Sequence, residues 1–259
     1  KNYQFTALTN LGTSFGMGFI VSAFMVAQGG LMKENLFKAV LIGNLGAVVG
    51  SIISVNLMLH YSKKYFKSIG ESEEEKEIEK FVLDTREIRR GSIFGRFLEA
   101  MLEGGKVGVD MGIAIIPGVI IICTTVLMLT NGMPQGGYTG AAYEGIGILP
   151  IIGAKLNFIL KPLFGFTSPQ AIAFPITALG AVGAAIGLVP QFIKEGVIRP
   201  REIPVFTSMG KCWSGYLSTH VAMMDSLKDR ELTGKAIFSH TIGGLAAGMA
   251  ANFLYSLFV

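Results

Sequence analysis

Polar and ionisable side chains gather in one otherwise apolar stretch of the chain, residues 203–225. Lys211, Ser214, Tyr216 and His220 all lie within it. Such groups are costly at membrane depth, so they either pair with neighbouring protein or line a water-filled cavity. Hydroxyl, imidazole and ammonium groups can also hydrogen-bond a polar solute, and histidine can titrate near neutral pH. We therefore expect a substrate-binding site in this stretch.

Four residues elsewhere complete the predicted binding set: Asn10, Asn44, Asp110 and His240. The two asparagines lie in the first two apolar segments, Asp110 lies near the start of a third, and His240 lies in the last. An acid at membrane depth is costly, so Asp110 is expected to face other protein or water. For each histidine an alternative stays open, because a neighbouring carbonyl could satisfy the ring in a purely structural role.

The sequence contains no motif of nucleophilic, nucleotide-binding or metal chemistry. It has no P-loop, no GxGxxG, no CxxC, and no HExxH or HxxxH pattern around its three histidines. Both cysteines lie in apolar stretches, which predicts buried free thiols rather than a disulfide. We therefore expect no catalytic residues, no cofactor and no metal, and a membrane enzyme ranks last among the functions considered.

The composition is that of a membrane protein. Of the 259 residues, 51% are hydrophobic and only 15% are charged, whereas a soluble domain has about 25% charged residues. This predicts an all-α, multi-pass protein of the cell inner membrane, with the lipid bilayer as its first partner. Basic cytoplasmic loops explain the net charge of +4, so nucleic acid is not expected as a partner.

About five stretches are apolar and long enough to cross a hydrocarbon core of roughly 30 Å. They are residues 5–27, 36–59, 107–129, 168–192 and 236–259, and Pro175 is expected to kink the fourth of them. Residues 148–165 are shorter and more polar, which predicts a re-entrant or interfacial segment. Basic loops flank residues 203–225 on both sides, so this stretch should form a hairpin or a broken helix rather than a crossing.

Three regions follow from these patterns. Residues 1–60 should form a two-span helical hairpin, residues 61–93 a charged cytoplasmic connector, and residues 94–259 a transmembrane region. The last region opens with an amphipathic helix that the pair Gly104-Gly105 is expected to break. The basic loop 194–202 should share the cytoplasmic face of the connector.

Pairs of glycines four residues apart recur in three of the predicted spans. They are Gly12–Gly16, Gly46–Gly50 and Gly244–Gly248. This spacing lets two helix backbones approach closely, so we expect helix packing at these positions. Residues 26–46 also resemble residues 221–244 weakly. Many transporters are built from such internal repeats, with the substrate site between them.

Several short motifs in residues 94–259 resemble those of a known membrane family. They are Arg96-x-x-Glu99-Ala100-x-x-x-Gly104, then Ile115-Ile116-Pro117, and later Phe206-Thr-Ser-Met-Gly…Asp225. This region is similar to the Gate, or nucleoside-recognition, domain of concentrative nucleoside transporters, ferrous-iron transport protein B and spore-maturation membrane proteins. Its closest likeness is to uncharacterised bacterial inner-membrane members.

The resemblance implies a helical membrane protein with re-entrant hairpins and a polar site near the midplane. The chain lacks the Glu/Gln-rich hairpin of the nucleoside transporters, and it lacks the GTP-binding domain and Cys-rich gate of the iron transporters. The resemblance therefore does not identify the solute.

Together these features predict a transporter, or a subunit of a transport complex, that moves a small polar solute by alternating access. A nucleoside-like solute, a coupling ion, and a homo-oligomer or partner membrane subunit all fit this prediction. Two alternatives stay open: a non-transporting structural or signalling protein of the spore-maturation type, and an ion channel or ion transporter.

Overall fold

The computed structural model describes residues 3–69, 90–141 and 144–259, apart from the side chains of Ser218 and of some residues between 111 and 126. These residues form helices and connecting turns, without a strand among them. The longer helices are α1 (Tyr3–Ser14), α2 (Gly18–Ala27), α4 (Phe37–Ile69), α6 (Ile93–Thr130), α7 (Ile148–Phe164), α8 (Ala173–Gly180), α9 (Val182–Lys194), α10 (Glu202–Cys212), α11 (Leu217–Ser226) and α12 (Thr233–Phe258). Short turns of helix are α3 (Gly29–Met32), η1 (Pro169–Ile172) and η2 (Arg230–Leu232).

The number of membrane spans differs from the prediction of about five. Among the described residues, three helical stretches are long and apolar enough to cross a membrane: Tyr3–Met32, Phe37–Ile69 and Arg230–Phe258. A fourth is reached if α7 and the helix Pro169–Gly180, which bend by 78° relative to each other, count as one span. That bend agrees with the predicted re-entrant or interfacial segment at residues 148–165. Part of the apolar stretch 107–129 lies outside the described side chains, so its crossing stays a prediction.

Three of the predicted apolar segments are interrupted helices. Residues 203–225 break between α10 and α11, as predicted. Residues 5–27 break between α1 and α2, and residues 168–192 break at Ala181 between α8 and α9; neither break was predicted, although Tyr3–Met32 as a whole is long and apolar enough to span. Pro175 does not kink the second of these, because it lies in the first turn of α8, where no intrahelical bond needs its N–H.

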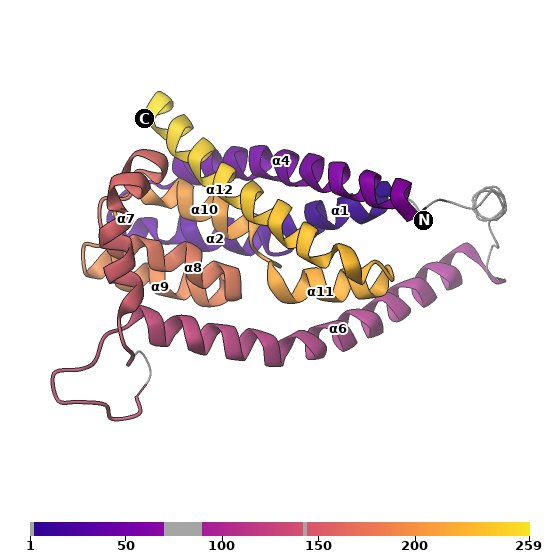
Figure 1. Cartoon of the computed structure of the whole chain (residues 1–259), viewed down its shortest axis with the longest axis horizontal. Coiled ribbons are helices and arrows are strands. Elements are labelled where there is room, and N and C mark those ends of the chain that lie inside the picture. Colours follow the sequence, from indigo (N-terminus) through magenta and orange to yellow (C-terminus); the bar gives the residue numbers. More distant parts are fainter. Residues whose placement is uncertain (1–2, 70–89, 142–143) are drawn as a thin grey trace.

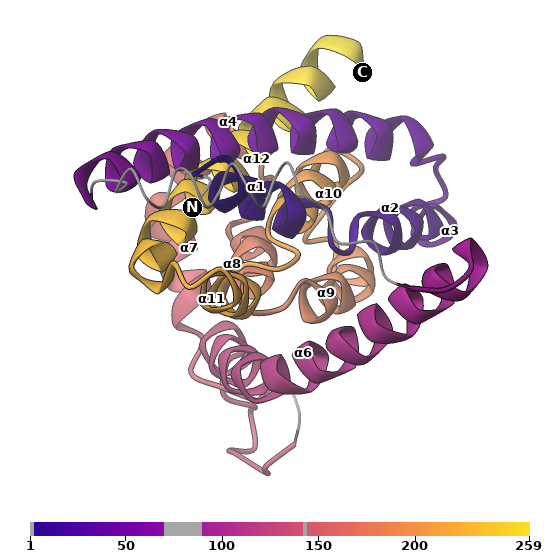
Figure 2. The ribbon, with the colours of Figure 1, turned by 90° about the vertical axis from the view of Figure 1, so that its right-hand side faces the viewer.

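The helix α6 is continuous through the glycine pair that was expected to break it. Ser92 caps its start by accepting a hydrogen bond from the Gly95 amide, and the helix continues past Gly104 and Gly105 to Thr130. A glycine costs only about 1 kcal/mol in a helix interior, and 38 residues of hydrogen bonding outweigh it. The helix runs along the side of the molecule opposite α4 (Figures 1 and 2).

The most extensive helix packing is between α4 and α12, which run antiparallel (Figure 1). A Cβ built on Gly46 would lie 2.8 Å from the Ala247 carbonyl oxygen, and one on Gly243 would lie 2.6 Å from the Gly50 carbonyl oxygen. A Cβ on Gly248 would lie 2.7 Å from Met209 Sδ, and one on Gly244 would overlap the Trp213 ring, so the predicted packing role of both later glycine pairs is confirmed, the last pair packing against α10 and its C-terminal end. It is wrong for the first pair, since Gly12 is exposed and its nearest neighbour would lie at 3.5 Å.

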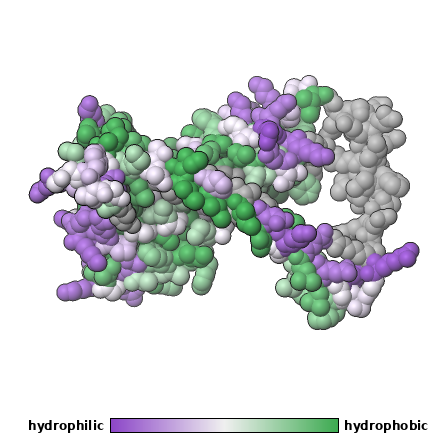
Figure 3. All heavy atoms as spheres, turned by 90° about the horizontal axis from the view of Figure 1, so that it is seen from below, coloured by the Kyte–Doolittle hydropathy of each residue, from purple (hydrophilic) through white to green (hydrophobic). Residues whose placement is uncertain are grey.

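Helices from both ends of the sequence contribute to one hydrophobic core. Val21 and Met25 of α2 are fully buried in the same cluster as Phe174 of α8 and Phe206 of α10. The last two rings stack with their centroids 4.1 Å apart. On the face seen in Figure 3, apolar side chains cover the middle and hydrophilic side chains gather toward the two ends, which is the banding expected of a protein in a bilayer.

Candidate functional site

The breaks of two interrupted helices lie against each other. Ser214, in the break between α10 and α11, donates a hydrogen bond of 2.8 Å to the carbonyl oxygen of Thr13 near the end of α1. A Cβ on Gly16, in the break between α1 and α2, would lie 3.5 Å from the Ser214 hydroxyl. Helix ends carry backbone groups without an intrahelical partner, so four such ends meet here in one place. Transporters often bind solutes and ions at such interruptions.

Two buried histidines lie beside these breaks. His220 and His240 are both fully buried, with their ring centroids 4.6 Å apart. His240 Nε2 contacts the Cys212 carbonyl oxygen, which can only accept, so Nε2 carries the hydrogen. His240 Nδ1 then accepts from the Ser54 hydroxyl, 3.3 Å away. A neutral His240 is therefore satisfied on both sides.

The partners of His220 are different, because both of its ring nitrogens face acceptors. Nδ1 lies 2.5 Å from the Tyr216 carbonyl oxygen, and Nε2 lies 3.2 Å from Asn10 Oδ1. The Asn10 amide is oriented by its nitrogen, which donates to the Ala236 carbonyl oxygen at 3.1 Å and to Ser54 at 2.9 Å. A neutral imidazole has only one N–H and can donate to only one of these two acceptors. With Asn10 in its assigned orientation, a second proton on His220 would therefore have an acceptor already in place.

Lys211 forms the second part of the site, at the end of α10. Only 8% of the residue is exposed, yet no carboxylate among the described residues forms an ion pair with it. Its ammonium donates to Asn44 Oδ1 at 2.6 Å and to the Ser22 hydroxyl at 3.3 Å. The same nitrogen lies 5.6 Å from the centre of the Phe15 ring. The cation is thus held by neutral groups only.

Seven of the eight predicted site residues are brought to this region. Asn10, Ser214, Tyr216, His220 and His240 lie around the breaks, with the Tyr216 hydroxyl bonded to Thr241. Asn44 and Lys211 form the adjoining pair. Asp110 is the exception, because it lies on α6 with an exposed side chain and joins none of these contacts.

Sequence reasoning missed several residues that build the site. Ser54 links Asn10 to His240, and it could have been found, because it lies one turn beyond Gly50 on the small-residue face of α4. Thr13 contributes only a backbone carbonyl, which has no signal in the sequence. Glu202 is fully buried and accepts from the amides of Thr167 at 2.7 Å and Arg199 at 2.9 Å, so it holds the loops that enter α10.

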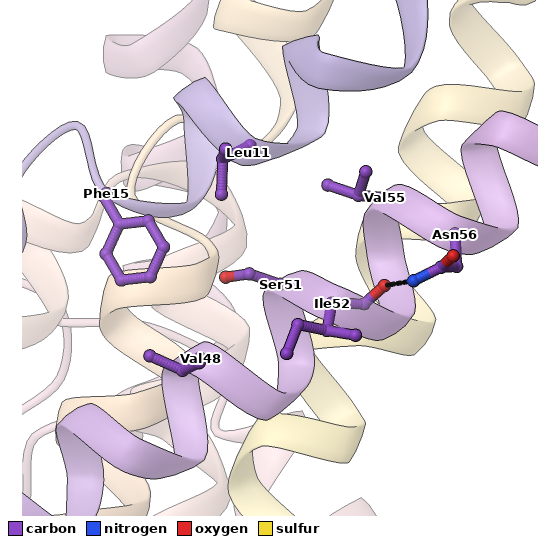
Figure 4. Close-up of a pocket in the computed structure, with 7 residues that line it drawn as sticks. All are labelled: Leu11, Phe15, Val48, Ser51, Ile52, Val55 and Asn56. Atoms are coloured by element: carbon purple, nitrogen blue, oxygen red, sulfur yellow. Dashed lines mark hydrogen bonds between the residues drawn. The ribbon is translucent and has the colours of Figure 1, made fainter. Parts of the chain in front are cut away.

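An apolar groove of about 250 Å³ lies between α1 and α4, next to this site (Figure 4). It is lined by Leu11, Phe15, Val48, Ser51, Ile52, Val55 and Asn56. Its two polar lining residues are turned to their own helix, since Ser51 donates to the Ala47 carbonyl and Asn56 to that of Ile52. The groove can therefore hold an apolar group but cannot by itself select a polar one.

Among the described residues, no three His, Cys, Asp or Glu side chains are grouped closely enough to hold a metal ion. Comparisons of the chain with protein-family models, curated proteins and solved structures find no match. They leave the resemblance to the Gate domain untested, so the function is argued from the geometry of the site.

Proposed function

We propose that the chain is a membrane transporter, or a subunit of a transport complex, for a small polar solute. One observation carries the proposal: the breaks of α1/α2 and α10/α11 meet, with Ser214 bonded to the Thr13 carbonyl oxygen. Non-helical backbone at membrane depth is tolerated where it lines a cavity or is buried in protein, and discontinuous helices form the solute sites of many transporters. We place the protein in the bacterial inner membrane with a multi-pass topology.

The coupling ion that fits the site best is a proton. His220 has an acceptor on each ring nitrogen, whereas His240 is already satisfied in its neutral form. A proton added to Nε2 of His220 would donate to Asn10 Oδ1, and two charged rings with centroids 4.6 Å apart would repel each other. The pair is therefore suited to hold one extra proton, on His220.

A second function is favoured by a different observation. Among the described residues, no buried side-chain nitrogen or oxygen lacks a hydrogen-bond partner. A structural or signalling membrane protein without a solute would also satisfy its buried polar groups internally. In that case the His220 and Lys211 contacts would serve packing alone.

Uptake into sealed proteoliposomes separates the two functions. A panel of labelled nucleosides, amino acids and organic acids would be tested with and without an inward proton gradient. The proposal expects uptake of at least one solute class and its stimulation by the gradient, with this stimulation lost in His220→Gln. Absence of uptake across the panel, together with a lowered melting point of His220→Gln, would favour the structural role.

A further inference from the structure

The buried charge of Lys211 has no counter-charge within the described part of the protein. Lysine is almost never fully buried unless it is paired, because an unpaired buried charge is costly. Asn44 and Ser22 offer only neutral oxygens, and they use two of the three N–H groups of the ammonium. One donor and a full positive charge are therefore left for another group.

A second positive feature points at the same place. The helix α2 begins at Gly18 without a side-chain cap, and although the Gly18 amide donates to the Phe15 carbonyl oxygen at 3.0 Å, this end of α2 is the positive end of the helix dipole. A Cβ on Gly18 would lie 3.1 Å from Lys211 Cε and 3.4 Å from its Nζ. The ammonium therefore lies beside the positive end of α2, which adds to the cost of a buried charge without a counter-charge.

We propose that Lys211, beside the first turn of α2, binds an oxyanion, a carboxylate or phosphate group of the transported solute. That the solute is transported rests on the proposed function, whereas binding of the anion at Lys211 does not depend on transport. An oxyanion here would accept the third ammonium N–H in a strong charge-assisted bond, and the positive end of the α2 dipole would favour its negative charge.

Two sources could supply such a group. A water-soluble acid would reach Lys211 through the helix breaks. A fatty acid would place its chain in the groove of Figure 4, since Phe15 lines that groove and also lies 5.6 Å from the Lys211 ammonium. The shared chemistry is the oxyanion, and the assay below distinguishes the two sources.

The test compares acids with their neutral amides on the purified protein in detergent, with the melting temperature as the readout. The water-soluble pair is succinate and succinamide, inorganic phosphate is a further probe, and the lipid pair is oleate and oleamide. We expect at least one acid to stabilise the protein while its amide does not. We also expect Lys211→Met to weaken the binding of that acid by about ten- to a hundredfold. Lys63→Met, which removes an exposed lysine of α4, should leave binding unchanged.

A second variant keeps the inference falsifiable if Lys211→Met folds poorly. Asn44→Asp puts a carboxylate where an amide oxygen now lies 2.6 Å from the ammonium. It should raise the melting temperature without ligand and abolish the response to acids, because it supplies the missing anion internally. If acids fail to bind and Asn44→Asp destabilises the protein, the anion site is overturned. Uptake of a neutral solute in the same preparation would then still support the transport proposal. Acid binding without any uptake would support the anion site and contradict the transport proposal.

Discussion

Replacing Gly50 by alanine tests the packing that brings the two ends of the chain together. A Cβ at this position would lie 2.6 Å from the Ala247 Cβ, closer still to the Gly243 carbonyl oxygen, and 3.0 Å from Cys212 Sγ. Two of these neighbours are fixed by the backbone of α12, so the helices must separate. Overpacking of this kind costs about 1–3 kcal/mol. The gain in helix propensity from glycine to alanine is about 1 kcal/mol and opposes it.

The matched control is Gly187→Ala in α9. Gly187 is exposed, and nothing lies within 4 Å of a Cβ built on it, so this variant has the propensity gain without the clash. The free energy of unfolding of Gly50→Ala should therefore fall below that of Gly187→Ala by about 1–3 kcal/mol.

Tryptophan fluorescence gives the assay, because Trp213 is the single tryptophan of the sequence and reports directly on this packing. It is 3% exposed and donates to the His240 carbonyl oxygen at 3.1 Å. Denaturant titrations in mild detergent would give both free energies. Equal stability of the two variants would mean that α4 and α12 do not approach at Gly50, and the described arrangement of the site would then be wrong.

Three further predictions concern the loop, the proton and the topology. Thr139 hydrogen-bonds the Glu144 carboxylate and lowers the pKa of that carboxyl. The contact therefore stabilises the loop fully at pH values above the ordinary Glu pKa, and this stabilisation is lost as the pH falls through the lowered pKa. The hydrogen-exchange protection factor of the Thr139 amide, which donates to the carboxylate at 2.9 Å, should fall in acid, and in Glu144→Gln it should already be low at neutral pH; an unchanged protection factor would contradict the contact. His220→Gln should purify normally and flatten the pH dependence of uptake between about pH 5 and 8, and a retained dependence would assign the proton elsewhere. Cysteines at Ser68 and Glu195 should both resist an impermeant reagent added outside whole cells, and labelling of either overturns the predicted orientation.

The sequence predicted the long apolar helices better than their interruptions. The stretches that became α4, α6 and α12 are strongly apolar, so hydropathy located them well. The breaks at residues 15–17 and at Ala181 were missed, because apolar residues continue through both and only tertiary packing decides where the helix stops. The reverse error occurred at Gly104, where local propensity predicted a break that the helix passes through.

The candidate site was predictable in its residue types but not in its pairing. Polar residues in an apolar segment are rare, so Lys211 and His220 were identified from position alone. Their partners come from segments about 165 to 210 positions away, such as Asn44 and Asn10, and no local pattern encodes such a contact. Asp110 carried the same signal as these residues but lies on the exposed face of α6, so polarity in an apolar segment does not by itself mark a site.

Water access to the meeting point of the two helix breaks tests the central claim most directly. Ser214→Cys would be made in a chain whose two native cysteines are replaced, and labelled with an impermeant maleimide from outside whole cells and, separately, in inverted membrane vesicles. A solute path with alternating access predicts labelling from both sides of the membrane. Labelling from one side only, or from neither while Glu195→Cys labels fully in the vesicles, would contradict it.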